Sequence, residues 1–262
     1  MNRVAIVTGG AKPDSIGFAV VQGLLAEGCE VVVADLYTEG FSALKSCLCI
    51  RTDVADPASV EAMIRKTVER HGRIDILVSC VGGSWGITPQ DLTAPPRRGF
   101  LGLTNCELAD WRTILGANLD SAFYCSRAAA PHLKKQGGAI VNVASVAARK
   151  GIPPGAEGSS GPYAVAKAGV MGLTRQLALE LGEFGVRVNC VAPGVIASGR
   201  LKKVLSLTGK DRGPEGPLLA GIPMGRVGTV AETAALIVAL CGDDTAYMTG
   251  ATLDVNGASY LA

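Results

Sequence analysis

A tyrosine and a lysine four residues apart are the side chains of this sequence best suited to chemistry. Tyr163 and Lys167 are separated by Ala164-Val165-Ala166, so they lie on one face if this stretch is helical. A neighbouring ammonium group favours the ionised form of a phenol and lowers its pKa. The ordinary pKa of tyrosine, about 10, is too high for easy proton exchange near neutral pH. The pair therefore predicts an acid/base for alcohol and ketone chemistry, although the same spacing also occurs on ordinary solvated helix faces.

A glycine-rich turn near the N-terminus has the order of a dinucleotide site. The apolar run 4–7 precedes the turn 8–17, which reads Thr-Gly-Gly-Ala-Lys-Pro-Asp-Ser-Ile-Gly, and a segment with helix-like apolar spacing follows. Backbone N–H groups in such a turn can approach a pyrophosphate at the helix N-terminus. A second apolar run ends at Asp35, 18 residues beyond Gly17, where an acid can bind ribose hydroxyls. A glycine turn alone would fit any strand–helix unit, but the acid favours a dinucleotide.

Two further polar residues stand where chemistry is plausible. Ser145 ends the buried-strand pattern Ile140-Val141-Asn142-Val143-Ala144, and Asn118 lies in Gly116-Ala117-Asn118-Leu119 within a predicted helix. Each has an ordinary structural interpretation as a strand-end serine or a helix-embedded asparagine. Together with the tyrosine and the lysine, these two residues make the ordinary structural interpretations less convincing.

On these residues the sequence resembles the short-chain dehydrogenase/reductase family over nearly its whole length. The resemblance implies four catalytic residues, Asn118, Ser145, Tyr163 and Lys167. Tyr163 would exchange the proton and Ser145 would hold the substrate oxygen. Lys167 would lower the pKa of Tyr163 and bind the nicotinamide ribose, and Asn118 would anchor a water for proton exchange. The resemblance also implies these cofactor-binding residues: Gly9, Ser15, Ile16, Gly17, Asp35, Asp53, Val54, Gly82, Tyr163, Lys167, Pro193, Gly194, Ile196 and Ser198.

Several segments depart from the family pattern. The glycine turn is two residues longer than usual and has Ser15 in place of its middle glycine, which resembles the turn of the family's enoyl reductases. The usual Asn-Asn-Ala-Gly segment reads Ser79-Cys80-Val81-Gly82. Residues 84–104 are an apparent insertion, and residues 149–162 lengthen the gap between the catalytic serine and tyrosine. We expect these two segments and 195–225 to be substrate loops, although the two insertions could equally be surface decoration.

The elements that must position these residues alternate between strand and helix along the chain. This order predicts an α/β fold, a Rossmann-type doubly wound parallel sheet of about seven strands with helices on both faces, in a single domain 1–262. Asp56 is the expected N-cap of the second helix. The predicted strands are 4–7, 30–34, 48–51, 75–80, 138–144, 186–191 and 251–255, and the predicted helices are 16–27, 57–72, 108–135, 162–183 and 229–241.

The expected activity is hydride transfer between a nicotinamide cofactor and a secondary alcohol or ketone. An NAD(P)H-dependent enoyl-thioester reductase is the first alternative, suggested by the glycine turn. The family's enoyl reductases space tyrosine and lysine more widely than the three-residue gap found here. A non-catalytic NAD-sensing protein is the second alternative, and the presence of the whole acid/base set disfavours it.

Charge predicts the cofactor better than the substrate. Asp35 would repel a 2′-phosphate, which favours NAD over NADP, whereas Lys12 in the turn could attract one. Basic residues of the expected substrate loops indicate either solvated loop charge or an anionic, carrier-linked substrate. Trp85 could line the pocket or simply pack. The basic residues in question are Arg97, Arg98, Lys202, Lys203, Lys210 and Arg212.

Composition excludes several other classes. The chain has 262 residues, of which 48% are hydrophobic, and a net charge of +2, so it shows no nucleic-acid footprint. No apolar run approaches the ~18 residues of a membrane span, and we expect a cytoplasmic protein. Eight cysteines without a Cys-x-x-Cys pair, together with two isolated histidines, predict reduced structural thiols and no metal site. The resemblance further implies a homodimer or homotetramer.

Overall fold

The structure is a computed structural model of the 262-residue chain. It describes residues 2–84, 101–154, 160–199, 201–202, 219 and 221–262. Trp85, Arg97, Arg98, Lys203, Lys210 and Arg212, and with them most of the predicted basic clusters, lie outside the described residues.

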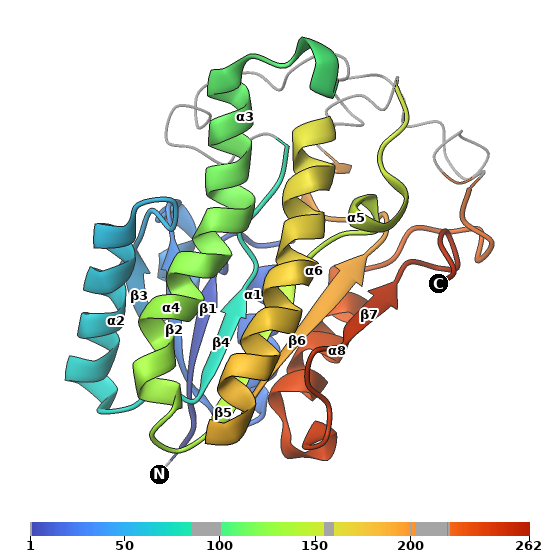
Figure 1. The fold of residues 1–262 in the computed structure, drawn as a ribbon. Helices are drawn as coiled ribbons and strands as arrows, with labels where there is room; N and C mark the ends of the chain where they lie inside the picture. Colours follow the sequence, from blue (N-terminus) through green and yellow to red (C-terminus); the bar gives the residue numbers. More distant parts are fainter. Residues whose placement is uncertain (1, 85–100, 155–159, 200, 203–218, 220) are drawn as a thin grey trace.

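One parallel sheet of seven strands forms the centre of the molecule, as the sequence predicts (Figure 1). Its strand order is β3-β2-β1-β4-β5-β6-β7, and every neighbouring pair is parallel. The chain starts in the middle of the sheet and winds outward in both directions, which makes it a doubly wound Rossmann-type fold. The strands are β1 (Val4–Thr8), β2 (Glu30–Asp35), β3 (Leu48–Arg51), β4 (Ile76–Ser79), β5 (Gly138–Val143), β6 (Val186–Pro193) and β7 (Thr252–Val255).

Helices cover both faces of the sheet. On one face, α1 (Ile16–Ala26) and α8 (Val230–Cys241) pack against each other and share one hydrophobic core with the sheet. On the other, α2 (Pro57–His71), α4 (Ser121–Leu133) and α6 (Gly161–Leu181) form a second core. The strands bury β-branched residues on both sides, as expected for a parallel sheet between two helical layers.

Local sequence signals account for where the helices begin and end. Asp56 accepts a hydrogen bond from Ala58 N and caps α2, as predicted, and the left-handed Gly72 (φ 77°) ends that helix. Thr229 and Glu232 form a reciprocal capping box at the start of α8. The observed elements otherwise differ from the predicted bounds by one or two residues, which is the normal uncertainty of helix and strand ends.

The predicted helix 108–135 is helical over residues 108–133, but one turn inside it departs from α-helical geometry, which the prediction did not include. It consists of α3 (Leu108–Leu115), a π-helical turn (Gly116–Asp120) and α4. The side chain of Asn118 donates to Ile114 O at 2.8 Å and so occupies a carbonyl of the preceding turn. Such π-turns often mark functional sites, and this one contains a predicted catalytic residue.

Two of the predicted substrate loops meet where they are described. Leu101, near the end of the 84–104 segment, forms a β-bridge with Ser160, and Gly161 N donates to Leu101 O at 2.8 Å. A short 3-10 helix, Leu103–Asn105, follows this bridge, and Leu103 packs against Gly161. The two departures from the family pattern therefore contact each other at the first turn of α6.

Three observations concern the predictions for the cysteines, for a metal site and for a membrane span. All eight cysteines are free thiols. Among the described residues, no group of three or more histidine, cysteine or acidic side chains is arranged to hold a metal ion. No helix in that part of the chain combines the length and apolarity needed to cross a bilayer.

Candidate active site

The predicted site residues gather at one edge of the sheet. Asp35 ends β2, Ser79 ends β4, Ser145 follows β5 by two residues and Pro193 ends β6. The carboxyl ends of parallel strands lie at a common edge, and ligands of open α/β sheets bind there. Residues that are more than 150 positions apart in the sequence are thus brought to one side of the molecule.

Helix α6 presents the tyrosine and the lysine on one face. Ser160 caps the helix and accepts a hydrogen bond from Tyr163 N at 3.4 Å. Pro162 occupies the first turn, where its missing N–H is not needed. The Nζ atom of Lys167 lies 5.9 Å from the centre of the Tyr163 ring. Their helical spacing is as the sequence predicts, and Tyr163 is half-buried.

Lys167 is anchored against the strand that carries the serine. Its side chain is almost completely buried, with 3% exposed, and its Nζ donates to Val143 O at 2.7 Å. Val143 is the last residue of β5, two positions before Ser145. The Oγ of Ser145 accepts a hydrogen bond from Ala147 N at 3.1 Å. An accepted bond uses a lone pair and leaves the hydroxyl proton for donation to a substrate oxygen.

The side chain of Asn118 clamps the loop that follows β4. Its Oδ1 accepts from Gly83 N at 2.8 Å, and its Nδ2 donates to Gly83 O at 2.9 Å as well as to Ile114 O. Both amide protons are therefore used within the protein. A Cβ atom at Gly82 would lie only 2.6 Å from Asn118 Oδ1 and from Lys167 Nζ. Gly82 is thus the close neighbour of two predicted catalytic residues, and the water-anchoring role of Asn118 stays a prediction.

Ser79 and Cys80, which replace the two asparagines of the family pattern, supply no reactive group. Ser79 is buried, and its Oγ has no hydrogen-bond partner among the described residues. Burial raises the pKa of the Cys80 thiol to about 12, although the charge of Lys167 opposes this shift. A thiol with such a pKa is not a nucleophile near neutral pH.

The glycine turn brings its backbone close to the start of α1. Gly9 has a left-handed backbone (φ 73°), and a Cβ at Gly17 would overlap the Gly9 carbonyl. Ser15, which replaces the usual middle glycine, is the N-cap of α1 and accepts from Phe18 N at 3.0 Å.

The longer turn also makes a contact that the sequence analysis did not predict. Asp14 accepts a hydrogen bond from Gly199 N at 3.0 Å and its Oδ2 lies 3.4 Å from Lys202 Nζ, so the turn contacts the segment after β6.

Asp35 is fixed by the backbone around it. It is 6% exposed, and its two carboxylate oxygens accept from Ala11 N at 2.9 Å and Tyr37 N at 3.0 Å. Burial raises the pKa of Asp35, while these two N–H groups and the charge of Lys12 oppose the shift. The Nζ of Lys12 lies 3.1 Å from the centre of the Tyr37 ring. Sequence reasoning identified Lys12 but missed Tyr37, which the turn after β2 brings to it.

The remaining predicted cofactor residues lie in turns held by their neighbours. Asp53 accepts from Ala55 N at 3.0 Å, and Val54 after it is buried. Gly194 packs against Asn256, where a Cβ atom would lie 2.8 Å from Asn256 Cα. Two further residues of this segment are Ile196, which bridges to Gly228, and Ser198, whose Oγ accepts from Leu201 N at 3.4 Å.

These residues fit a nicotinamide dinucleotide. The first turn of α1 and the glycine backbone of the turn before it suit a pyrophosphate, and Asp35 has lone pairs left for ribose hydroxyls because each carboxylate oxygen can accept more than one bond. Because residue 82 is a glycine, Lys167 and Asn118 can lie directly against its backbone. The set is that expected for binding a dinucleotide along the carboxyl edge of the sheet.

Comparison with known proteins gives matches over nearly the whole chain. A family model described as enoyl-(acyl carrier protein) reductase matches residues 9–258. The short-chain reductase protein NovJ of Streptomyces niveus is 36% identical over 97% of this chain and 92% of its own length. The 3-oxoacyl-(acyl-carrier-protein) reductase FabG of Escherichia coli (strain K12) is 33% identical over 99% of this chain and 98% of its own. The crystal structure of gox2181 superposes with a TM-score of 0.82 at 31% identity and covers 98% of this chain and 95% of that one.

A doubly wound sheet with these residues at its carboxyl edge is the arrangement expected of a nicotinamide-dependent oxidoreductase. The matches rest on sequence identity along nearly the whole chain as well as on similarity of fold. The chain belongs to the short-chain dehydrogenase/reductase family, and it acts on an alcohol or ketone with a nicotinamide cofactor. The expected fold and class of activity are thereby confirmed.

Proposed function

We propose that this protein reduces 3-oxoacyl thioesters to the corresponding 3-hydroxyacyl thioesters, with Tyr163 as the acid that protonates the carbonyl oxygen. The observation that carries the proposal is the packing of Lys167 between Tyr163 and the end of β5, where Ser145 follows. The substrate class is supported by the two acyl-carrier descriptions among the matches. A nicotinamide cofactor supplies the hydride when bound.

Each side chain has a defined task at the substrate oxygen. Ser145, oriented by Ala147 N, donates its hydroxyl proton in a hydrogen bond that strengthens as negative charge develops. Tyr163 delivers its phenolic proton to the same oxygen. The buried ammonium of Lys167 then stabilises the phenolate that remains. In the reverse direction the phenolate accepts the proton of the alcohol.

The reaction is tested by following reduced-nicotinamide absorbance with three substrates: a 3-oxoacyl thioester, a neutral ketone and an enoyl thioester. We expect turnover of the first and its loss in Tyr163→Phe with cofactor binding retained. Tyr124→Phe is the matched control, because Tyr124 packs on α4 against the core, and it should keep full activity. Substantial turnover by Tyr163→Phe would remove this residue from the mechanism.

The family description and the long glycine turn favour one second candidate, an enoyl-thioester reductase. That reaction would be supported by reduction of the enoyl thioester alone. Binding of the cofactor with no turnover of any of the three substrates, unchanged in Tyr163→Phe, would instead support a sensor without catalysis.

We infer that the preferred cofactor is NAD. The carboxylate of Asp35 is held in place by two backbone N–H groups, so it cannot swing away from a 2′-phosphate, and like charges at close range repel. The ammonium of Lys12 is engaged with the Tyr37 ring and lies near Asp35. The ratio of kcat/KM for NADH and NADPH measures this directly, and a preference for NADPH would contradict the role given to Asp35.

We also propose that a second copy of the chain covers α4 and α6. These helices expose large apolar side chains to water, namely Phe123 at 43%, Val165 at 40% and Leu179 at 80%. Light scattering coupled to size exclusion distinguishes the proposed dimer or tetramer from a monomer. The eight free thiols support the reducing cytoplasm as the proposed compartment.

A further inference from the structure

The amino-terminal edge of the sheet carries a groove on the side opposite the candidate active site. It has a volume of about 660 Å³ and lies where β4, β5 and β6 begin, with the last residue of α8 in its wall. A hollow of this size accommodates a small molecule. The oxidoreductase chemistry at the carboxyl edge makes no use of it.

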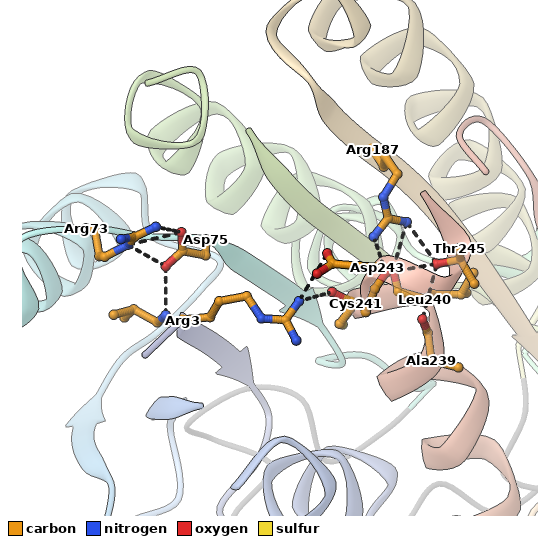
Figure 2. A network of polar contacts seen from close by, with 11 residues as sticks. Arg3, Arg73, Asp75, Arg187, Ala239, Leu240, Cys241, Asp243 and Thr245 are labelled. Atoms are coloured by element: carbon orange, nitrogen blue, oxygen red, sulfur yellow. Dashed lines mark hydrogen bonds and ion pairs between the residues drawn. The ribbon is translucent and has the colours of Figure 1, made fainter. Parts of the chain in front are cut away.

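The charged side chains that line this groove carry more positive than negative charge. They are three arginines, Arg3, Arg73 and Arg187, and two aspartates, Asp75 and Asp243. Figure 2 shows them in two groups, with Arg73 and Asp75 together and with Arg3 and Arg187 on either side of Asp243. The first group is neutral, whereas the second has one carboxylate for two guanidinium groups.

The first group is saturated by its own contacts. Arg73 Nη2 lies 2.6 Å from Asp75 Oδ1, and its Nε donates to the same carboxylate at 2.9 Å. Asp75 also accepts from Val4 N at 2.8 Å and from Gln136 Nε2 at 3.3 Å. This carboxylate is therefore occupied and does not compensate the arginines across the groove.

Among the described residues, Arg187 donates its hydrogen bonds to neutral acceptors. Its Nη1 donates to Leu240 O at 2.9 Å and to Thr245 Oγ1 at 3.1 Å, and its Nη2 donates to Gly242 O at 2.8 Å (Figure 2). Burial lowers the pKa of Arg187, and the neighbouring charge of Arg3 acts in the same direction, while Asp243 opposes it. The half-buried cation is thus stabilised by dipoles at the end of α8 and by no close carboxylate among the described residues.

Arg3 faces the same space with donors to spare. Its Nη1 donates to Cys241 O at 3.0 Å and lies 3.7 Å from Asp243 Oδ1. The Asp243 side chain is 96% exposed, so water screens this pair strongly. Within the part of the chain that the structure describes, the Nε and Nη2 groups of Arg3 make no hydrogen bond.

Capping of the α8 C-terminus explains part of this arrangement, because cations stabilise the negative end of a helix. It requires neither a second guanidinium nor the open volume next to it. We propose that the groove binds a small anion that carries a phosphate or pyrophosphate group, held by Arg3 and Arg187. A dianion there would neutralise both arginines through charge-assisted hydrogen bonds, the contact for which the guanidinium fork is best suited.

Calorimetric titration with pyrophosphate tests this site, with the enzyme saturated with NADH so that the glycine turn is blocked. We expect saturable binding that weakens about tenfold in Arg3→Gln, the loss of one charge-assisted hydrogen bond. Asp243→Asn removes the opposing charge and should tighten binding about threefold, a gain that a folding defect cannot produce. Arg65→Gln on α2 is the matched control, because Arg65 is 65% exposed and does not line the groove, and this variant should bind pyrophosphate as the wild type does.

The source of the phosphate group is distinguished in the same experiment. Equal affinity for pyrophosphate and ADP would indicate that the groove binds the phosphate groups alone, as in a free inorganic anion. Tighter binding of ADP that is lost in Tyr247→Ala assigns it to a nucleotide, because the fully exposed Tyr247 lies at the groove and its ring can stack on a base. No binding in the presence of NADH, or binding that is unchanged in Arg3→Gln, would overturn the proposal. Catalytic activity is not needed for any of these readouts.

Discussion

A single methyl group added at Gly82 is expected to inactivate the enzyme while the protein remains folded. The Cβ atom of alanine would lie 2.6 Å from both Asn118 Oδ1 and Lys167 Nζ, whereas ordinary contacts with Cβ begin near 3.4 Å. Each of these atoms must therefore retreat by about 0.8 Å, which approaches the misplacement of ~1 Å that can lower a rate about a hundredfold. Lys167 is 3% exposed and cannot move into water, so its displacement strains the 2.7 Å bond to Val143 O.

The substitution also strains the backbone. Gly82 has φ 154°, a region that side chains disfavour, and a residue held there costs of order 1–3 kcal/mol. We therefore expect a lower thermal midpoint together with a kcat/KM reduced at least about a hundredfold, or about 2.7 kcal/mol in the transition state. Thermal unfolding and steady-state kinetics measure the two effects separately.

A control separates steric displacement from backbone strain. Gly72→Ala introduces a side chain at φ 77°, where nothing lies within 4 Å of the new Cβ, and it should cost about 1–2 kcal/mol of stability with unchanged kinetics. Near wild-type kcat/KM in a folded Gly82→Ala protein would refute the reasoning. It would mean that Lys167 and Asn118 do not need their observed positions.

Two further predictions concern a helix cap and an ion pair. Ser160→Ala removes the N-cap of α6 and should cost about 1 kcal/mol of stability. It should also lower kcat, because the cap holds Tyr163 N. Asp56→Ala, at the N-cap of α2, should cost similar stability but leave kcat unchanged, and equal kinetic effects of the two variants would argue against a positioning role for Ser160. The hydrogen bond from Arg226, followed by those from Thr229, lowers the pKa of Glu232 from 4.5 to about 2, so its contribution to stability is present above pH 4.5 and is lost as the pH falls towards 2. Urea midpoints of wild type and Glu232→Gln should therefore converge through this acid window, and a constant difference would count against the ionised carboxylate of Glu232 as the source of the stability.

The sequence predicted the class of fold and the main chemistry because both depend on local patterns. Apolar runs alternating with helical periodicity are enough to indicate a parallel sheet with helices on two faces. Tyr163 and Lys167 are one turn apart on a single helix, so their relation needs no tertiary information. Asp35 is a strand-end residue, and the topology of parallel strands alone places such an acid at the edge where Ser145 also lies.

Contacts between distant segments were not readable from the sequence. In the π-turn, the side chain of Asn118 pairs with Gly83 from the loop after β4, whose N–H donates to Oδ1 and whose carbonyl accepts from Nδ2. The periodicity of residues 108–135 contains no signal for this partner and predicts an unbroken helix. The bridge between Leu101 and Ser160 likewise joins two loops whose apolar patterns are unremarkable.

By itself, then, the sequence determined that this chain forms a doubly wound sheet, and it predicted a tyrosine-based acid/base beside a dinucleotide-binding turn. Only the tertiary structure decided that Gly82 lies against Lys167, that the glycine turn reaches Lys202, and that Arg3 and Arg187 share one groove at the amino-terminal edge. The physical reason is the range of the interactions. Periodicity and capping act over one or two turns of the chain, whereas these contacts join residues whose separation in space is set by how the layers pack.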